Sequence, residues 1–292
     1  MLEVIIVDGG STDATVKIAR EYSTRVVSTP LNAPAAYNYA IKHTNSEILG
    51  FIDADAKVEK EWLTKLVPHL DDPQVAGVSG GIETWNAENA WARSIGYDLR
   101  NRYARLSKYV VRVATMNLLL KKHIIEDVGW FDENLPSQYD TDLGFRITSR
   151  GYKIVYDSNA KCHHFNRTTL RAYFRQQLQY GKNTLRLYFK HKNLAKGDGI
   201  TDFGMNIQPI LFLAVLALFF LGVPAFTRLF WYLAGGLLLV ILAYFLFSAI
   251  KVSIKFRDKS AMRLVVLYFV RSCAWFAGAV ITSVKYITGD RR

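Results

Sequence analysis

Two pairs of aspartates in this sequence have the residue types and the spacing to do chemistry. Asp53 and Asp55 follow an apolar run at 48–52, and Asp140 and Asp142 open a helical pattern. Carboxylates at alternate positions after a strand can reach one hard divalent cation or its waters, and such a cation binds phosphate groups. An isolated Asp-x-Asp can also be only the start of a loop, and acids at a helix N-terminus are explained by the helix dipole. The strands and helices around each pair must therefore decide between a cation site and a purely structural role.

The elements around Asp53 form a β-α-β alternation. The run at 48–52 is typical of an interior strand of a parallel sheet, with both faces covered. Ligands of open α/β sheets bind outside the carboxyl ends of the strands, which is where Asp53 lies. Upstream we expect strands at 2–7 and 25–28 and helices at 14–22 and 35–42.

The loop at 8–13 reads Asp-Gly-Gly-Ser-Thr-Asp and follows the first expected strand. Its glycines let the backbone approach a ligand, and the N-terminus of the following helix favours phosphate. The Gly-x-Gly-x-x-Gly pattern of dinucleotide-binding proteins is missing, which argues against a nicotinamide enzyme. On its own this loop is a weak signal for a phosphate ligand.

Charge and cysteine content limit the class of protein. The chain has 292 residues and a formal net charge of +12, which favours nucleic acid, anionic lipid or phosphorylated substrates as partners. Its two cysteines, Cys162 and Cys273, provide neither a disulfide framework nor a Cys-rich zinc motif. The first seven residues resemble a strand and not a signal peptide, so we expect this end of the chain in the cytoplasm.

Residues 158–197 contain nine Lys or Arg and no acid. Basic positions at helical spacing beside aromatic and aliphatic residues are typical of an interfacial helix on anionic lipid. Nucleic acid is the competing partner, and we argue against it because the segment leads into apolar helices and carries no nucleic-acid motif. We therefore expect a basic amphipathic interfacial segment at 167–203. Its regularly spaced basic residues are Arg167, Arg171, Arg175, Lys182, Arg186 and Lys190.

Apolar runs at 207–226 and 229–250 each reach the length of about 20 residues that a bilayer span requires. The Thr227–Arg228 connection predicts a tight hairpin between them. A third run, 264–287, contains Arg271, which costs about 2.5 to 3.5 kcal/mol at a helix centre. We favour three spans over two spans and an interfacial helix, in a transmembrane region at 204–292. The loop after the second run is predicted to be cytoplasmic from Lys251, Lys255, Arg257, Lys259 and Arg263.

Four motifs occur in an order that is specific when they are taken together. They are VIIVDGGSTD at 4–13, FIDAD at 51–55, VGWFDE at 128–133 and DTDLGFR at 140–146. Over residues 2–180 the chain resembles the family 2 glycosyltransferases. The resemblance implies a GT-A fold at 1–166, which is a Rossmann-like α/β domain with a mostly parallel sheet. It also implies inverting, metal-dependent transfer of a sugar from a UDP- or GDP-linked donor, with Mn²⁺ or Mg²⁺ as cofactor.

The resemblance also implies roles for single residues. The aspartate matching Asp8 contacts the nucleobase, and Asp53 and Asp55 hold the nucleotide and its metal. One of His163 and His164 approaches the diphosphate or the metal. Asp140 matches the base that accepts the acceptor's proton, and Asp142 is the alternative base. The expected set is Asp8, Gly10, Ser11 and Asp53 for the nucleotide; Asp53, Asp55 and His164 for the metal; Asp140 for catalysis; Arg167, Arg171, Arg175 and Gln176 for the acceptor or a lipid phosphate; and Asp142 and Asn117 in support.

Three departures from the family pattern affect these expectations. Tyr139 replaces the usual Glu before the base, and residues 176–180 match the Gln-x-x-Arg-Trp of processive members only in part, which favours single-sugar addition. Members normally carry one more strand and helix before the strand at 2–7, so we expect an N-terminally short domain.

These observations predict a membrane-bound glycosyltransferase with its catalytic domain in the cytoplasm. The expected acceptor is a lipid-linked, polyprenyl-type glycan, in the synthesis of a cell-surface glycan or a glycoprotein glycan. A polyprenyl-phosphate monosaccharide synthase is the alternative within the same class. A non-catalytic membrane partner with a degenerate nucleotide site is the alternative from another class. The sequence leaves a homo-oligomer open and does not name the base, the sugar or the acceptor.

Overall fold

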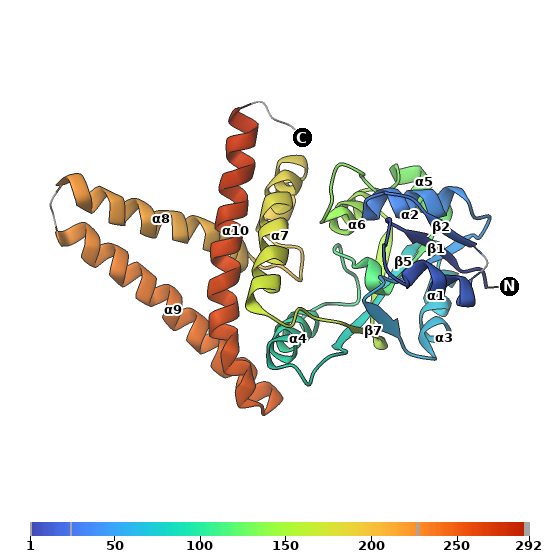
Figure 1. Ribbon diagram of the computed structural model, residues 1–292, viewed down its shortest axis with the longest axis horizontal. Coiled ribbons are helices and arrows are strands. Elements are labelled where there is room, and N and C mark those ends of the chain that lie inside the picture. The colour runs from blue at the N-terminus through green and yellow to red at the C-terminus, as the bar shows by residue number, and fades with distance from the viewer. Residues whose placement is uncertain (1, 24, 226–227, 289–292) are drawn as a thin grey trace. The chain divides into compact units, whose positions relative to one another are not determined.

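The computed structural model describes residues 2–23, 25–225 and 228–288 (Figure 1). The chain divides into two compact units. We call residues 1–54, 58–81 and 107–162 the sheet unit, and residues 55–57, 82–106 and 163–292 the helical unit.

Two sheets carry the strands. The smaller consists of β1 (Ile5–Asp8) and β2 (Arg25–Ser28), which pair in parallel and are joined by α1 (Thr15–Tyr22). The larger has the strand order β3-β6-β5-β7-β4. Its members are β3 (Ile48–Phe51), β6 (Leu118–Lys121), β5 (Val75–Thr84), β7 (Lys153–His164) and β4 (Ala56–Val58).

The larger sheet corrects two expectations. Strand β6 runs antiparallel to both β3 and β5, so the sheet is mixed and not mostly parallel. Strand β3 stands at the end of the strand order, with alternating exposed and buried residues, and is not an interior strand covered on both faces. An apolar run indicates burial but carries no information on strand direction.

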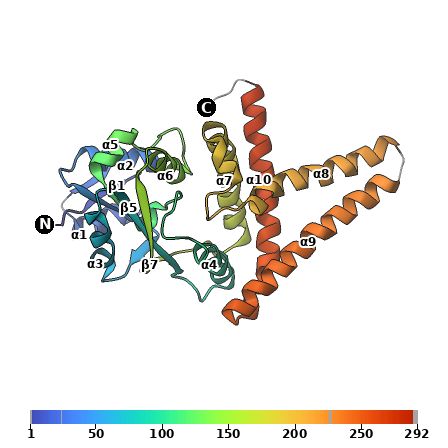
Figure 2. The ribbon, with the colours of Figure 1, turned by 180° about the vertical axis from the view of Figure 1, so that it is seen from behind.

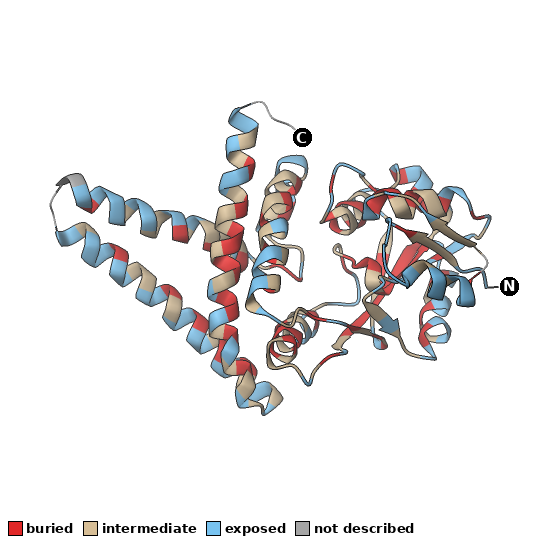
Figure 3. Cartoon of the chain, in the orientation of Figure 1, coloured by how far each residue is buried: buried red, intermediate tan, exposed pale blue. Residues whose placement is uncertain are grey.

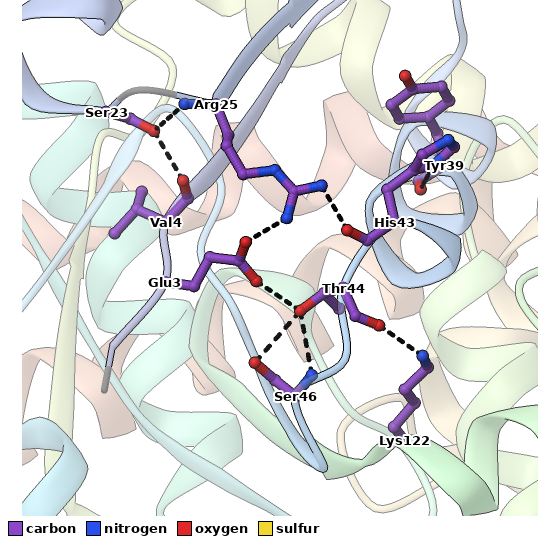
Figure 4. A network of polar contacts seen from close by, with 9 residues as sticks. All are labelled: Glu3, Val4, Ser23, Arg25, Tyr39, His43, Thr44, Ser46 and Lys122. Carbon is purple, nitrogen blue, oxygen red and sulfur yellow. Dashed lines mark hydrogen bonds and ion pairs between the residues drawn. The ribbon is translucent and has the colours of Figure 1, made fainter.

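A polar network joins the small sheet to the rest of the sheet unit (Figure 4). The guanidinium group of Arg25 donates to Glu3 and to the backbone oxygen of His43. The Thr44 hydroxyl donates to the other oxygen of Glu3 over 2.6 Å. Lys122 then donates to the Thr44 backbone oxygen over 2.6 Å. The N-terminal end of the chain is thereby connected to the C-terminal end of helix α2 (Ala33–Lys42) and the start of α5 (Lys122–Val128).

The core of the sheet unit packs α3 (Trp62–Leu66) against the larger sheet. Asn117, which is fully buried, links three elements at this place. Its amide nitrogen donates to the backbone oxygens of Gly81 and Ala160, and its oxygen accepts from the Trp62 indole over 2.7 Å. Both the nitrogen and the oxygen of this amide form hydrogen bonds, so Asn117 supports the sheet structurally.

Five helices make up most of the helical unit. They are α4 (Ala90–Tyr103), α7 (Leu170–Lys190), α8 (Phe203–Ala225), α9 (Arg228–Phe256) and α10 (Leu264–Ile287). By length and composition, α8, α9 and the segment Lys259–Ile287 that contains α10 can each span a membrane. Part of the expected tight connection, Thr227, lies outside the described residues, as do Phe226 at the end of the first expected span and the C-terminal residues 289–292.

Helix α10 differs from the other two apolar helices in its surroundings. In its most apolar stretch 44% of the residues are buried in protein, against 17% for α8 and 22% for α9. Figure 3 shows the buried stripe on α10 and the largely exposed surface of α8 and α9. Buried Arg271 lies on this stripe, which explains how an apolar helix can carry an arginine.

Helix α7 packs lengthwise against α10 (Figures 1 and 2). The backbones come closest at Gly181 and Gly278, where an added Cβ atom would lie within 2.7 Å of the facing helix. Gln177 accepts from the Trp275 indole over 3.0 Å at the same contact. Tyr173 and Leu187 are buried, so part of the apolar face expected to lie on lipid is covered by protein.

Candidate nucleotide and metal site

Asp8, at the end of β1, organises the loop that follows it. Its carboxylate accepts from the backbone N–H groups of Gly10 and Ser11 at 3.0 and 2.9 Å and from the hydroxyls of Ser11 and Ser28. The hydrogen bonds from the Ser11 and Ser28 hydroxyls lower the pKa of Asp8 to about 2. Gly10, at φ +99°, supplies the left-handed backbone that the turn requires. The loop is therefore preformed around an ionised carboxylate.

Asp53 lies two residues after β3 and is bound by Tyr37 of α2. The Tyr37 hydroxyl donates to Oδ1 of Asp53. Burial, together with the charge of Asp53, raises the pKa of Tyr37, so the phenol stays protonated and remains a donor. The Tyr37 ring lies 5.4 Å from Phe51 and 5.4 Å from Phe131, between ring centroids. Asp53 is thus oriented by a rigid aromatic neighbour.

Tyr139 belongs to the same aromatic cluster. Its ring lies 5.8 Å from Phe131 and 6.0 Å from Tyr37, and its hydroxyl is 3.5 Å from that of Thr115. The residue that replaces the family's Glu therefore packs beside the group that orients Asp53. It is a structural neighbour of the site in place of an acid.

Asp140 stands in the first turn of α6 (Tyr139–Ser149) and is half-buried. Burial raises the pKa of Asp140 to about 6, Arg112 opposes the increase, and the charge of Asp53 adds to it. The preceding Gln138 has φ +68°, a left-handed conformation that is rare for a residue with a side chain. Such strain occurs at functional sites, where it aims a side chain. A carboxylate with a pKa near 6 can accept a proton at neutral pH.

Asp142, the alternative base, is held in an ion pair. It is fully buried and forms an ion pair with Arg146, whose Nη2 lies 2.7 Å from Oδ2. Arg146 also donates to the backbone oxygens of Val128 and Trp130, each over 2.6 Å. Asp142 therefore holds the turn after α5 through Arg146, a supporting role.

Asp55 follows Asp53 by two residues and belongs to the helical unit. Its Oδ1 lies 3.4 Å from Nε2 of His164, and its Oδ2 lies 3.7 Å from Nη1 of Arg167. Burial would raise the pKa of Asp55, but His164 and Arg167 outweigh it and the pKa is lowered. The sequence-based candidates Asp55, His164 and Arg167 therefore lie together.

Asn166 determines the tautomer of His164. Its amide nitrogen donates to Thr84 Oγ1 and the backbone oxygen of Ala92, at 3.1 and 3.4 Å. Its amide oxygen consequently faces Nδ1 of His164, 3.1 Å away, and can only accept. A protonated His164 presents an N–H at Nε2 to Asp55 and so lowers the pKa of that carboxyl, whereas in a neutral His164 the proton resides on Nδ1 and the lone pair of Nε2 faces Asp55. This is how metal-binding histidines are commonly oriented.

Mn²⁺ or Mg²⁺ is the cation that the sequence predicts at Asp55 and His164. Among residues 2–23, 25–225 and 228–288, no group of three or more His, Cys, Asp or Glu side chains is arranged to hold a metal. Asp55 and the Nε2 lone pair of His164 nevertheless form a two-donor set of oxygen and nitrogen. A hard cation in phosphate chemistry uses one or two carboxylates and takes its other ligands from substrate and water. The two side chains fit such an ion.

The three residues predicted to contact the acceptor in addition to Arg167 lie on α7. Arg171 and Arg175 are exposed on α7, and Gln176 is half-buried there. The neighbouring Gln177, and not Gln176, makes the buried contact with α10. These three side chains can meet an acceptor only at the surface of the helix.

Tyr37, Asn166 and the role of Arg146 were not predicted from the sequence. Tyr37 lies on a helix that was predicted, but its spacing matches an ordinary core position. Asn166 is two residues after His164, which was a usable signal because an amide at that distance can orient a histidine. Arg146 stands four residues after Asp142, the spacing at which opposite charges meet on a helix.

Residues 1–127 match the family model described as Glycosyl transferase family 2. Glycosyltransferase AglE of Haloferax volcanii is 31% identical over 163 residues, 53% of each chain, so the match covers about half of that relative. The probable glycosyltransferase YdaM of Bacillus subtilis is 26% identical over 94% of this chain and 73% of its own. The mannosyltransferase PcManGT of Pyrobaculum calidifontis, solved with GDP-Man and Mn²⁺, superposes with a TM-score of 0.57 at 18% identity, covering 97% of this chain and 78% of that one. Residues 1–127 thus match glycosyltransferase family 2, and the chain has a GT-A-like domain followed by three long apolar helices.

Proposed function

We propose that this chain is a membrane-bound inverting glycosyltransferase. It transfers a sugar from a nucleotide diphosphate sugar to a lipid-linked, polyprenyl-type acceptor at the cytoplasmic face of the cell membrane. The product belongs to a cell-surface glycan or a glycoprotein glycan. The observation that carries the proposal is Asp140, a half-buried carboxylate with a pKa of about 6 that follows the residues matched to family 2.

Asp140 is the group that accepts the proton of the attacking acceptor. At neutral pH most of this side chain is ionised, and its raised pKa makes it a stronger base than an ordinary aspartate. Attack from the side opposite to the leaving nucleotide inverts the anomeric centre. In this proposal Asp140 occupies the acceptor's side of the sugar.

Asp8 and Asp53 orient the nucleotide in the proposal. Asp8 fixes the loop that contains Gly10 and Ser11, and Asp53 is held by Tyr37. Asp55 and His164 are the residues that would hold Mn²⁺ or Mg²⁺. The cation supplies neutralisation of charge on the departing diphosphate. PcManGT, which is described with GDP-Man and Mn²⁺, supports this class of donor and cofactor.

The acceptor is inferred from the helical unit. Three apolar helices long enough for a bilayer favour a substrate that is itself anchored in lipid. Exposed Arg171 and Arg175 on α7 offer positive charge to the phosphate of such a substrate or to anionic lipid. Arg167 extends this basic surface to Asp55.

The cytoplasmic placement rests on the basic loop between α9 and α10, which contains Lys259 and Arg263. A variant with Cys162→Ser, Cys273→Ser and a single new cysteine at Lys259 tests it. A membrane-impermeant thiol reagent is expected to label inside-out vesicles and to leave sealed right-side-out vesicles unlabelled. The reverse pattern would place the domain on the other side.

Transfer itself is tested with membranes that contain the full chain, incubated with labelled UDP- and GDP-sugars and Mn²⁺ and then extracted for lipid. Label is expected in the lipid fraction for the wild type and not for Asp140→Asn, which should still bind nucleotide. Asp127→Asn removes an exposed carboxylate of the same unit and should transfer normally. If the product is a bare lipid phosphate carrying one sugar, the chain is a polyprenyl-phosphate monosaccharide synthase. Absence of nucleotide binding by the wild type would make it a non-catalytic partner with a degenerate nucleotide site.

A further inference from the structure

A cavity of about 360 Å³ lies within the helical unit, between α4 and the ends of α8, α9 and α10. Its size is at the small end of the range of ligand pockets, roughly 300 to 1,000 Å³. Figures 1 and 2 show α4 beside the end of α10 that follows α9. None of its lining residues belongs to the candidate nucleotide and metal site.

The lining of this cavity is strongly basic. Five cationic residues face two acids, which leaves an excess of three positive charges. The cations are Arg102, Arg105, Lys251, Lys255 and Arg271, and the acids are Asp98 and Asp202. A pocket with this balance attracts an anion.

Asp98 is shared between the guanidinium groups of Arg102, which is mostly buried, and Arg271, which is buried. Its Oδ2 lies 3.0 Å from Nη2 of Arg102 and 3.2 Å from Nη1 of Arg271, and the Tyr268 hydroxyl donates to Oδ1 over 3.1 Å. Burial opposes the ionisation of Asp98, but Arg102 and Arg271 keep its pKa below its usual range. One carboxylate therefore compensates two arginines, and a buried positive charge remains.

The two arginines also carry donors without acceptors. Nε of Arg102 and Nε of Arg271 are buried and have no hydrogen-bond partner among the residues that the structure describes. Arg271 is only 4% exposed. Leaving a charged donor unsatisfied in the interior is expensive, and native proteins rarely do so. Planar guanidinium groups match the oxygens of a phosphate particularly well.

The position of the cavity indicates where its ligand comes from. Asp202 directly precedes α8 and Gln208 lies in its first turns. Lys251 and Lys255 lie in the last turns of α9, and Arg271 in the first half of α10. These ends of the three candidate spans line one cavity, and consecutive spans of a membrane would bring the same three ends to one bilayer surface, where the phosphates of lipid headgroups lie. A lipid could insert its headgroup here while its chains remain in the bilayer.

We propose that this cavity binds a phosphate or diphosphate group between Arg102 and Arg271, with Lys251 and Lys255 at its entrance. A membrane lipid is the source that the location favours, and free pyrophosphate is the other source of the same chemistry. The proposal does not rest on the transfer reaction. It is a binding site in the membrane part of the chain, separate from the residues assigned to the donor.

Binding is measured on the purified full chain in a neutral detergent by native mass spectrometry and calorimetric titration. The probes are short-chain phosphatidic acid, short-chain phosphatidylcholine and inorganic pyrophosphate. The wild type is expected to bind phosphatidic acid and not phosphatidylcholine. Arg102→Gln should weaken binding by about 10- to 100-fold, because a charged hydrogen bond is lost.

A pair of double variants keeps the test decisive if Arg102→Gln fails to fold. Lys251→Gln with Lys255→Gln leaves the Asp98 ion pairs intact and should still weaken binding of phosphatidic acid by several-fold, in line with two lost charges. Lys259→Gln with Arg263→Gln removes the same charge from exposed positions outside the cavity and should have no effect. Equal losses in both double variants, or no binding by the wild type, would overturn the proposal. Tighter binding of pyrophosphate than of phosphatidic acid would keep the phosphate site and assign it a soluble ligand.

Discussion

Nε2 of His164 lies 3.4 Å from Oδ1 of Asp55, and the Asn166 amide oxygen on the other side of the ring holds the proton of a neutral imidazole on Nδ1. An acceptor lone pair thus faces a carboxylate. The two groups attract each other only if the imidazole is protonated or a cation lies between them. Asn166 is therefore a positioning residue for the two side chains that we propose to hold the metal.

The first prediction follows from this relationship. Asn166→Ala should weaken Mn²⁺ binding by about 10- to 100-fold, as is typical when a residue that orients a metal ligand is lost. Mn²⁺ affinity is measured directly by electron paramagnetic resonance, without turnover. Asn166→Asp retains an acceptor for Nδ1 and should restore much of the affinity, whereas Asn159→Ala, an exposed control, should have no effect. Unchanged affinity in Asn166→Ala would show that the metal does not use His164.

The second prediction concerns the pH dependence of transfer. Since Asp140 has a pKa of about 6 and must be ionised to act as a base, kcat/KM should fall below pH 6 and reach a plateau above about pH 7. Arg112 lowers this pKa, so Arg112→Gln should move the midpoint to higher pH. Asp53 raises it, so Asp53→Asn should move the midpoint down in whatever activity remains. A midpoint that neither variant moves would assign the base to another group.

The sequence could single out the candidate aspartates of the site, but it could not predict the side chains that contact them. Spacing and family motifs identified Asp53, Asp55 and Asp140, and the structure connects each to a partner that the motifs do not contain. Tyr37 and Asn166 act through the tertiary fold, which brings together residues that lie 16 positions apart or in separate strands and loops. No local pattern encodes those contacts.

The sheet and the basic helix show two other limits of the sequence. The apolar residues of β6 look the same in a parallel or an antiparallel strand, so the mixed sheet could not be deduced from them. The apolar face of α7 suits lipid or another helix equally well. The small residues Gly181 and Gly278, which permit close helix packing, were the available sign that α10 covers it.

The third prediction tests the contact between Tyr37 and Asp53. Tyr37→Phe keeps the ring in the aromatic cluster and removes the hydroxyl that donates to Asp53. The free energy of unfolding should fall by about 1.5 to 3 kcal/mol, the range for a hydrogen bond to a charged group. Nucleotide affinity, measured by titration, should also weaken. Tyr39→Phe, on the same helix but stacked on His43, is the control and should leave nucleotide affinity unchanged.

The fourth prediction separates the supporting role of Asp142 from that of a base. Arg146→Met leaves Asp142 buried without its partner and frees the Val128 and Trp130 carbonyls, so stability should fall by about 3 to 5 kcal/mol. Arg150→Met breaks an exposed ion pair with Asp127 and should cost at most about 1 kcal/mol. Urea unfolding followed by tryptophan fluorescence measures both. Asp142→Asn should likewise destabilise the chain while the folded fraction keeps its transfer activity. Loss of transfer at unchanged stability would instead make Asp142 the base, because a purely structural acid cannot be removed without a cost to folding.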